Sequence, residues 1–265
     1  MLRSAYKHFL AYRRNFCRGT AELDNKMKNT EIRSIMVLGD SISKGVVYSD
    51  EKKRYVFYKE GFINGVSSLL KVPVHNLSKF GSTVKSGMSL LAEKFSALEP
   101  DIVLIEYGGN DCDFDWDDVA KRPEADHQPR ATLEAYEKSL IKTVSYVKEM
   151  GKTPVLMNLP PLNDAAYFDW FTQGSAEKGE RILKWLRDKN RIYWWQEQYS
   201  CSTEDTARRT DTRLINIRSA FLRAEDYRRF LCKDGIHPNE KGQLLIKEVL
   251  RDYIYKNASY LLSAT

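Results

Sequence analysis

Short apolar runs alternate with segments of helical periodicity along most of this chain, and this order constrains the fold more than any other feature. Strands separated by helices pair through right-handed crossovers, which builds a parallel sheet covered on both faces. We therefore predict an α/β fold, a three-layer α/β/α sandwich around a mainly parallel five-stranded sheet. Strands are predicted over residues 34–39, 72–78, 101–109, 153–161 and 213–217, and helices over 55–71, 86–98, 131–151, 176–199 and 239–256.

The 265 residues, with 42% hydrophobic content, suffice for one domain with a sizeable core. Most of the net charge of +6 lies in the first residues, which carry Arg3, Lys7, Arg13, Arg14 and Arg18 and no acid. The rest of the chain has no basic stripe, so we expect no nucleic-acid partner. The predicted organisation is a basic N-terminal extension over residues 1–30, a single domain over 31–258 and a C-terminal tail over 259–265.

The four cysteines, Cys17, Cys112, Cys201 and Cys232, are scattered and form no C-x-x-C pair. This pattern is typical of reduced thiols in a cytoplasmic protein. No apolar run approaches the ~18 residues that a membrane span requires, and the first residues lack the apolar core of a signal peptide. We expect a cytoplasmic protein without an integral membrane segment. Paired aromatic residues leave a homodimer open.

Polar and small residues follow the predicted strands. Open parallel sheets bind ligands beyond the carboxyl ends of their strands, so these residues are expected to share one edge. Each group alone is ordinary turn or capping chemistry. The residues are Gly39, Asp40 and Ser41 after the first strand, Gly81 after the second, Asn110 and Asp111 after the third, and Asp234 and His237 before the last helix.

Together these residues supply every role that nucleophilic catalysis requires. A hydroxyl needs a base to take its proton, an acid to orient that base, and donors for the oxyanion. Ser41 provides the hydroxyl, His237 the base and Asp234 the orienting acid. Asn110 offers an amide donor and Gly81 an unshielded backbone N–H.

This set resembles the SGNH hydrolases, also called the GDSL esterase/lipase family, from about Ile32 to Ile254. The stretches "GDSISKG", "NLSKFGST", "GGND" and "DGIH" are similar to its four blocks. Only Ile42 departs from the family letters, replacing a leucine. The resemblance implies a flavodoxin-like three-layer fold over 31–258, the catalytic triad Ser41, Asp234 and His237, and an oxyanion hole formed by Ser41, Gly81 and Asn110.

The resulting hypothesis is a serine esterase that hydrolyses short-chain acyl esters or acetylated carbohydrates through an acyl-enzyme, without metal or cofactor. The partner is then a small-molecule or carbohydrate ester. Asp40 and Asp111 are expected to support the site by capping turns or binding backbone amides.

Three alternatives remain open at this point. An O-acetyltransferase would use the same acyl-enzyme and pass the acyl group to a sugar. A metal-dependent phosphoesterase could use Asp40, Asn110, Asp111, Asp234 and His237, although four histidines in the whole chain make ligands scarce. A non-catalytic binding module would have kept only the fold.

Three further stretches have no assigned role. Residues 111–130 are acidic and then broken by proline, which predicts a long loop beside the active site. The aromatic residues of 165–173 could line a pocket or belong to the core. Trp194 and Trp195 are adjacent, so they cannot share one face of a helix, and one of them is expected to face solvent, a partner or a lid.

Overall fold

The computed structural model describes residues 32–263 of the chain. The predicted extension over residues 1–30, together with Cys17, lies outside the described residues. The three remaining cysteines are free thiols. Within the described residues, no helix is both long and apolar enough to cross a membrane.

A five-stranded parallel sheet forms the centre of the molecule, with strand order β4-β1-β5-β6-β7. This confirms the predicted fold class. Gly39 at the end of β1 stands opposite Glu106 at the end of β5. The strands are β1 (Ile35–Gly39), β4 (Val74–Asn76), β5 (Ile102–Glu106), β6 (Thr153–Met157) and β7 (Arg213–Ile215).

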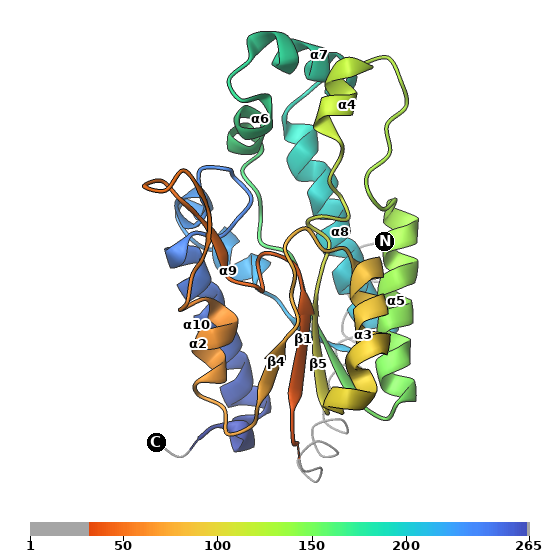
Figure 1. The fold of residues 1–265 in the computed structure, drawn as a ribbon, viewed down its shortest axis with the longest axis vertical. Coiled ribbons are helices and arrows are strands. Elements are labelled where there is room, and N and C mark those ends of the chain that lie inside the picture. The colour runs from red at the N-terminus through yellow and green to blue at the C-terminus, as the bar shows by residue number, and fades with distance from the viewer. Residues whose placement is uncertain (1–31, 264–265) are drawn as a thin grey trace, which may run out of the picture.

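Helices cover both faces of the sheet because successive strand residues point to opposite sides. Met36 and Leu38 of β1 join one core cluster, and Val37 joins the other. The first face is covered by α3 (Val84–Leu98), α5 (Leu133–Glu149) and α8 (Asn190–Arg209). The second face, on the left in Figure 1, is covered by α2 (Phe62–Ser67), α9 (Arg218–Leu222) and α10 (Glu240–Asn257).

Side-chain caps fix where the long helices begin, because the first backbone N–H groups of a helix lack partners inside it. The Thr83 hydroxyl accepts the N–H of Ser86 at the start of α3, where a complete capping box forms. Thr132 caps α5 and Asn239 caps α10 in the same way. The caps of α3 and α10 therefore lie just after Gly81 and His237, two of the predicted site residues.

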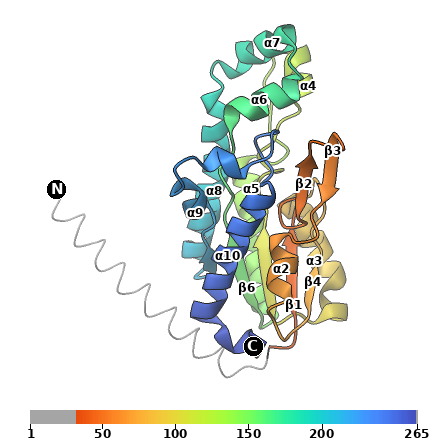
Figure 2. The same ribbon diagram turned by 90° about the vertical axis from the view of Figure 1, so that its left-hand side faces the viewer.

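The segment before α2 corrects the predicted helix over residues 55–71. The structure has an antiparallel hairpin there, β2 (Val46–Ser49) and β3 (Arg54–Phe57), and the helix covers only Phe62–Ser67. The two strands are rich in β-branched and aromatic residues, and a charged turn separates them, which favours a hairpin. Figure 2 shows the hairpin standing beyond the carboxyl end of β1.

Three helices, α4 (Trp116–Lys121), α6 (Asp164–Thr172) and α7 (Ala176–Leu186), lie beyond the carboxyl ends of the strands (Figures 1 and 2). We call them the helical cap. They share a separate core cluster that includes Trp116, Phe168 and Ile182. The predicted loop over 111–130 therefore contains a helix, and the predicted helix over 176–199 is two helices.

The last described residues pack against the domain. Two short 3-10 helices, η1 (Tyr227–Phe230) and η2 (Ser259–Leu261), flank α10. Leu261 is buried in the core cluster beneath α10, and Leu70 forms a β-bridge with Leu262. Residues 259–263 thus add to the folded core.

Candidate active site

Ser41 lies in a tight turn that directly follows β1. The backbone N–H groups of Lys44 and Gly45 donate to the carbonyl groups of Asp40 and Ile42, which winds residues 40–45 into helical turns. A side chain at Gly39 would place its Cβ 2.7 Å from the Cβ of Ser43, so the turn requires glycine there. The strand end and the turn together present the Ser41 side chain at the edge of the sheet.

The structure brings Ser41, His237 and Asp234 together, although Ser41 and His237 are 196 positions apart in the chain. Nε2 of His237 lies 2.8 Å from the Ser41 Oγ, and Nδ1 lies 2.6 Å from Oδ2 of Asp234. All three residues are buried. This is the geometry in which an imidazole can take a proton from a hydroxyl while a carboxylate holds the ring.

Asp234 is fully buried and accepts several hydrogen bonds. Its Oδ1 accepts the backbone N–H groups of Ile236 and His237, at 3.0 and 3.1 Å. Burial acts to raise the pKa of Asp234, but the hydrogen bond and charge of His237 and the two N–H groups outweigh it and hold the pKa below its usual range. Asp234 therefore carries a negative charge beside the imidazole at neutral pH.

The loop that carries Asp234 and His237 is packed against the first turn of α6. Gly235 has a φ of +76°, and a Cβ there would lie 2.6 Å from the carbonyl oxygen of Asn163. The Gly235 carbonyl accepts the Asn163 N–H at 2.7 Å. Glycine is thus needed for the backbone conformation and for the close approach.

The predicted oxyanion donors lie near Ser41. The Nδ2 of Asn110 donates to Oδ2 of Asp40 at 3.0 Å, which leaves its second amide hydrogen free to face the cleft that Asn110 lines. Gly81 has a φ of +72° and follows Phe80, whose ring stacks on His237 with the ring centres 6.0 Å apart. Among the described residues, the backbone N–H groups of Ser41 and Gly81 have no hydrogen-bond acceptor.

Asp40 and Glu106 form a buried pair of acids beside the nucleophile, and sequence reasoning missed Glu106. Burial and the charge of Asp40 raise the pKa of Glu106 well above its usual range. Burial also raises the pKa of Asp40, but Ile42, His237, Asn110 and Glu106 oppose it. Because Asp40 has more donors, we assign the charge to Asp40 and the proton to Glu106.

Asp111 lies at the start of α3 rather than in the cleft. Its two oxygens lie 3.1 and 3.2 Å from the backbone nitrogen of Val84, so the carboxyl group accepts an N–H at a helix N-terminus. Burial nevertheless raises its pKa to about 7, with a contribution from the charge of Asp40. Asp40 and Asp111 thus both bind backbone amides.

Tyr55 is the second residue that sequence reasoning missed. Its hydroxyl donates to Oδ2 of Asp234 at 2.9 Å, and its ring centre lies 4.9 Å from that of His237. Tyr55 belongs to β3, which the sequence analysis placed inside a helix. The aromatic and β-branched residues of "RYVF", which follow a charged turn, were the signal that could have revealed it.

A cleft of about 1240 Å³ extends from Ser41 and His237 to the helical cap. All five tryptophans of the chain line it, together with Tyr55, Phe80 and Phe114. Trp194 is 57% exposed at this cleft, whereas Trp195 is half-buried and donates its Nε1–H to the carbonyl of Cys112 at 3.1 Å. The expectation that one of the pair meets solvent is confirmed.

Charged and polar groups lie among these aromatic rings. Asp113 accepts hydrogen bonds from the hydroxyl of Tyr167 at 2.7 Å and the Nε1–H of Trp116 at 3.0 Å. Arg130, Lys178 and further carboxylates also line the cleft. The lining therefore offers flat apolar surfaces and hydrogen-bonding groups side by side.

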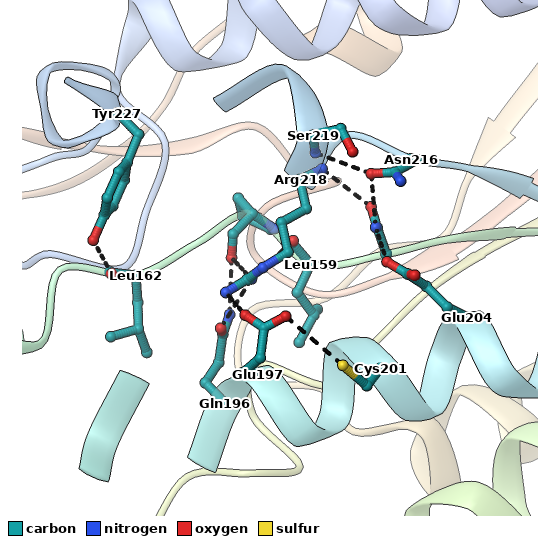
Figure 3. Close-up of polar contacts among 12 residues, drawn as sticks. Leu159, Leu162, Gln196, Glu197, Cys201, Glu204, Asn216, Arg218, Ser219 and Tyr227 are labelled. Atoms are coloured by element: carbon teal, nitrogen blue, oxygen red, sulfur yellow. Dashed lines mark hydrogen bonds and ion pairs between the residues drawn. The ribbon is translucent and has the colours of Figure 1, made fainter. Parts of the chain in front are cut away.

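A buried arginine holds one wall of the cleft in place (Figure 3). Nη1 of Arg218 donates to the carbonyl groups of Leu159 and Pro160, at 3.3 and 3.2 Å, and to Oε1 of Gln196 at 3.1 Å. Its Nη2 pairs with Glu197. Because Leu159, Pro160 and Gln196 line the cleft, this network fixes the backbone that follows β6.

The described residues contain no group of three or more His, Cys, Asp and Glu side chains arranged to hold a metal ion. The ligand cluster required by a metal-dependent phosphoesterase is therefore not found in this part of the chain. The predicted residues Asp234 and His237 instead contact each other and Ser41.

Comparison with protein families finds a match between residues 37–245 and the GDSL-like lipase/acylhydrolase family. A curated relative is the GDSL esterase/lipase WDL1 of Oryza sativa subsp. japonica. It is 24% identical over 170 residues, which cover 63% of this chain. The match spans 58% of the length of that rice protein.

Solved structures of similar fold include a lipase/acylhydrolase from Enterococcus faecalis, with a TM-score of 0.60 and 18% identity over 85% of this chain and 96% of that one. A catalytic mutant of Axe2, an acetylxylan esterase from Geobacillus stearothermophilus, has a TM-score of 0.59 and 18% identity over 88% and 97% of the two chains. The esterase EstA from Pseudoalteromonas sp., inhibited by monoethylphosphonate, has a TM-score of 0.52 and 19% identity over 84% and 97%. At these identities the similarity shows the fold.

Proposed function

The chain belongs to the GDSL-like lipase/acylhydrolase family of carboxylic ester hydrolases, and on that premise we propose that it is a serine esterase acting on short acyl esters of carbohydrates. The observation that supports this most is the hydrogen-bonded series Ser41, His237 and Asp234 at one end of the aromatic cleft. The size and lining of the cleft support the choice of alcohol.

In the proposed reaction, Oγ of Ser41 attacks the ester carbonyl while Nε2 of His237 takes the hydroxyl proton. The tetrahedral oxyanion collapses, the bond to the alcohol breaks, and His237 returns the proton to the leaving oxygen. Water then attacks the acyl-enzyme by the same steps and releases the carboxylic acid. His237 must be neutral to act as the base, so activity is expected to rise as the pH is raised towards neutrality.

The oxyanion would be stabilised by three donors, the backbone N–H groups of Ser41 and Gly81 and the free amide hydrogen of Asn110. Such donors are effective because they are oriented before the charge develops. The bond from Asn110 to Asp40 supports this role, since it fixes the direction of the amide.

The cleft favours a carbohydrate over a long acyl chain. Sugars present apolar faces that stack on aromatic rings and hydroxyl groups that need polar partners. The cleft offers both, with tryptophans beside Asp113, Arg130 and Gln196. The fold is shared with Axe2, which is an acetylxylan esterase. A long acyl chain would instead require a continuous apolar channel.

The test is a series of p-nitrophenyl esters of increasing acyl length, run beside a panel of acetylated oligosaccharides. We expect hydrolysis of acetyl esters, release of acetate from the oligosaccharides, and labelling of the protein by a serine-directed phosphonate. Ser41→Ala should lower turnover by about 10⁴-fold or more and abolish labelling. Ser68→Ala, on the exposed end of α2, is the matched control.

Wild-type turnover in the Ser41→Ala variant would refute the assignment of the nucleophile. A preference for long acyl chains would refute the proposed substrate class alone. The O-acetyltransferase alternative predicts acetylated acceptor sugar in place of free acetate when an acceptor is added, and product analysis separates the two reactions.

A further inference from the structure

Oδ2 of Asp234 is shared by two donors, and one of them comes from outside the loop that carries the triad residues. His237 Nδ1 lies 2.6 Å from this oxygen, and the hydroxyl of Tyr55 donates to it at 2.9 Å. The other oxygen accepts the N–H groups of Ile236 and His237. Among the described residues, Tyr55 of β3 is therefore the only residue outside this loop that donates a hydrogen bond to Asp234.

The hairpin is docked onto this loop at a second point. The backbone N–H of Tyr48 on β2 donates to Sγ of Cys232 at 3.3 Å, and the ammonium group of Lys233 lies 4.4 Å from the centre of the Tyr48 ring. Tyr48 and Tyr55 face each other across the hairpin. These contacts fix the position of β3, and with it the direction of the Tyr55 hydroxyl.

The Tyr55 ring is also held from the cleft side. Its centre lies 5.5 Å from that of Phe80 and 6.1 Å from that of Trp170 in the helical cap. Burial, together with the charge of Asp234, raises the pKa of Tyr55 above its usual value, so the phenol keeps its proton. Tyr55 is thus a hydrogen-bond donor to Asp234 at any pH at which the enzyme would work.

We propose that Tyr55 is a positioning residue of the active site, which holds Oδ2 of Asp234 in place and withdraws part of its negative charge from the His237 imidazole. The inference rests on the proposed function, because it assigns Asp234 and His237 to the reaction. A phenol that shares the carboxylate weakens the electrostatic stabilisation of a protonated imidazole. Tyr55 thereby extends the pH range in which His237 is neutral towards lower pH.

Two other titratable groups face Asp234 and His237. Asp40 faces His237 from the turn after β1, and Cys232 faces Asp234 from the same loop. Burial raises the pKa of Cys232 to about 12, so it is neutral. Replacing Tyr55 leaves Asp40 and Cys232 in place, which isolates the effect of the phenol.

The experiment compares the pH dependence of kcat/KM for p-nitrophenyl acetate in the wild type and in Tyr55→Phe. Losing the donor should move the acid limb up by about 0.5–1 pH unit, a three- to tenfold fall in kcat/KM on that limb, with KM nearly unchanged. Tyr48→Phe is the matched control, since it removes a phenol from the facing strand but keeps the backbone N–H and the ring that dock the hairpin. Its profile should coincide with that of the wild type.

Site-specific incorporation of difluorotyrosine at position 55 provides a variant in which the acid limb is expected to shift in the opposite direction. The more acidic phenol is a stronger donor, so the acid limb should move to lower pH. An unchanged profile in both Tyr55 variants, or an equal shift in Tyr48→Phe, would overturn the proposal. A general loss of structure would instead lower activity at every pH and lower the urea midpoint.

The His237 ring can also be titrated by NMR, which requires no turnover. The midpoint should move up in Tyr55→Phe and stay in place in Tyr48→Phe. If the wild type lacked esterase activity while this shift appeared, the proposed function would fail and the effect of Tyr55 on the imidazole would stand. If activity were present and the midpoint did not move, the role of Tyr55 alone would fail.

Discussion

The hydroxyl of Ser43, which lies two positions after Ser41, donates a 2.7 Å hydrogen bond to Oε2 of Glu106. This bond joins the turn after β1 to the end of β5. Because Glu106 also contacts Asp40, and Asp40 holds Asn110, the polar series continues to a proposed oxyanion donor. The buried acid thus supports the turn that carries Ser41.

If Glu106 is neutral in the folded protein, Glu106→Gln should preserve it. We expect this variant to keep the free energy of unfolding within about 1 kcal/mol and turnover within a few-fold, because the amide can donate and accept like a carboxylic acid. Glu106→Ala leaves the Ser43 hydroxyl without its partner, removes one of the donors to Asp40 and opens a buried cavity, and it should cost about 2–4 kcal/mol. Urea unfolding measures both, and equal losses in the two variants would contradict the assigned protonation.

Asn110→Ala tests the proposed oxyanion hole. Removing one side-chain donor of this kind lowers kcat by ~10²–10³-fold, and KM should change little because the donor acts mainly on the transition state. Steady-state kinetics with p-nitrophenyl acetate give both parameters. Asn64→Ala, an exposed position on α2, serves as the control. A loss confined to KM would place Asn110 in substrate binding instead.

Asp111 should make stability depend on pH. Its pKa is about 7 in the folded state, where burial raises it from the ordinary 3.8. Between these values the folded state binds the proton more tightly than the unfolded chain, so the contribution of Asp111 to stability falls as the pH rises from about 4 to 7.

Asp111→Asn removes this titration. The free energy of unfolding of the variant, relative to the wild type, should therefore increase by about 2–3 kcal/mol between pH 5 and pH 8. Urea unfolding at several pH values measures the difference. Asp252→Asn, an exposed position on α10, should show no such trend. A difference that stays constant with pH would contradict the raised pKa.

Trp194 tests the carbohydrate cleft. Its side chain is 57% exposed, so Trp194→Ala should leave the fold intact. Losing one stacking surface should raise KM for an acetylated oligosaccharide about three- to tenfold, while p-nitrophenyl acetate, which has no sugar ring to stack on Trp194, should be hydrolysed as before. Tyr255→Ala, an equally exposed aromatic on α10, is the control. Equal effects on both substrates would count against a sugar subsite.

The parallel sheet and the meeting of Ser41, Asn110, Asp234 and His237 could be predicted because both follow from local patterns. Apolar runs mark buried strands, and the carboxyl ends of parallel strands share an edge whatever the lengths of the connections. The positions of these residues along the chain were therefore enough to predict that they gather at one edge.

Tyr55 was missed, and the helical cap could not be predicted, each for a physical reason. The helical spacing of apolar residues in Phe62–Ser67 could be extended back through Tyr55. A four-residue strand is too short to show a clear two-residue period that would argue against a helix. The cleft combines tryptophans from α4, α6, α7 and α8, so it exists only in the tertiary structure. Glu106 did leave a signal, an acid within an otherwise apolar strand, and that signal was overlooked.

The helical cap is formed by two separate segments of the chain, one between β5 and α5 and the other between β6 and α8. Ser41, Asp234 and His237 belong to neither. An exchange of segments 114–129 and 164–189 for those of a related hydrolase would keep the hydrogen bond between Asn163 and Gly235, and it would replace the Trp170 side of the contact with Tyr55. In such a chimera the transplanted helices would determine which ester is preferred, and the residues of the present chain would still cleave the ester bond.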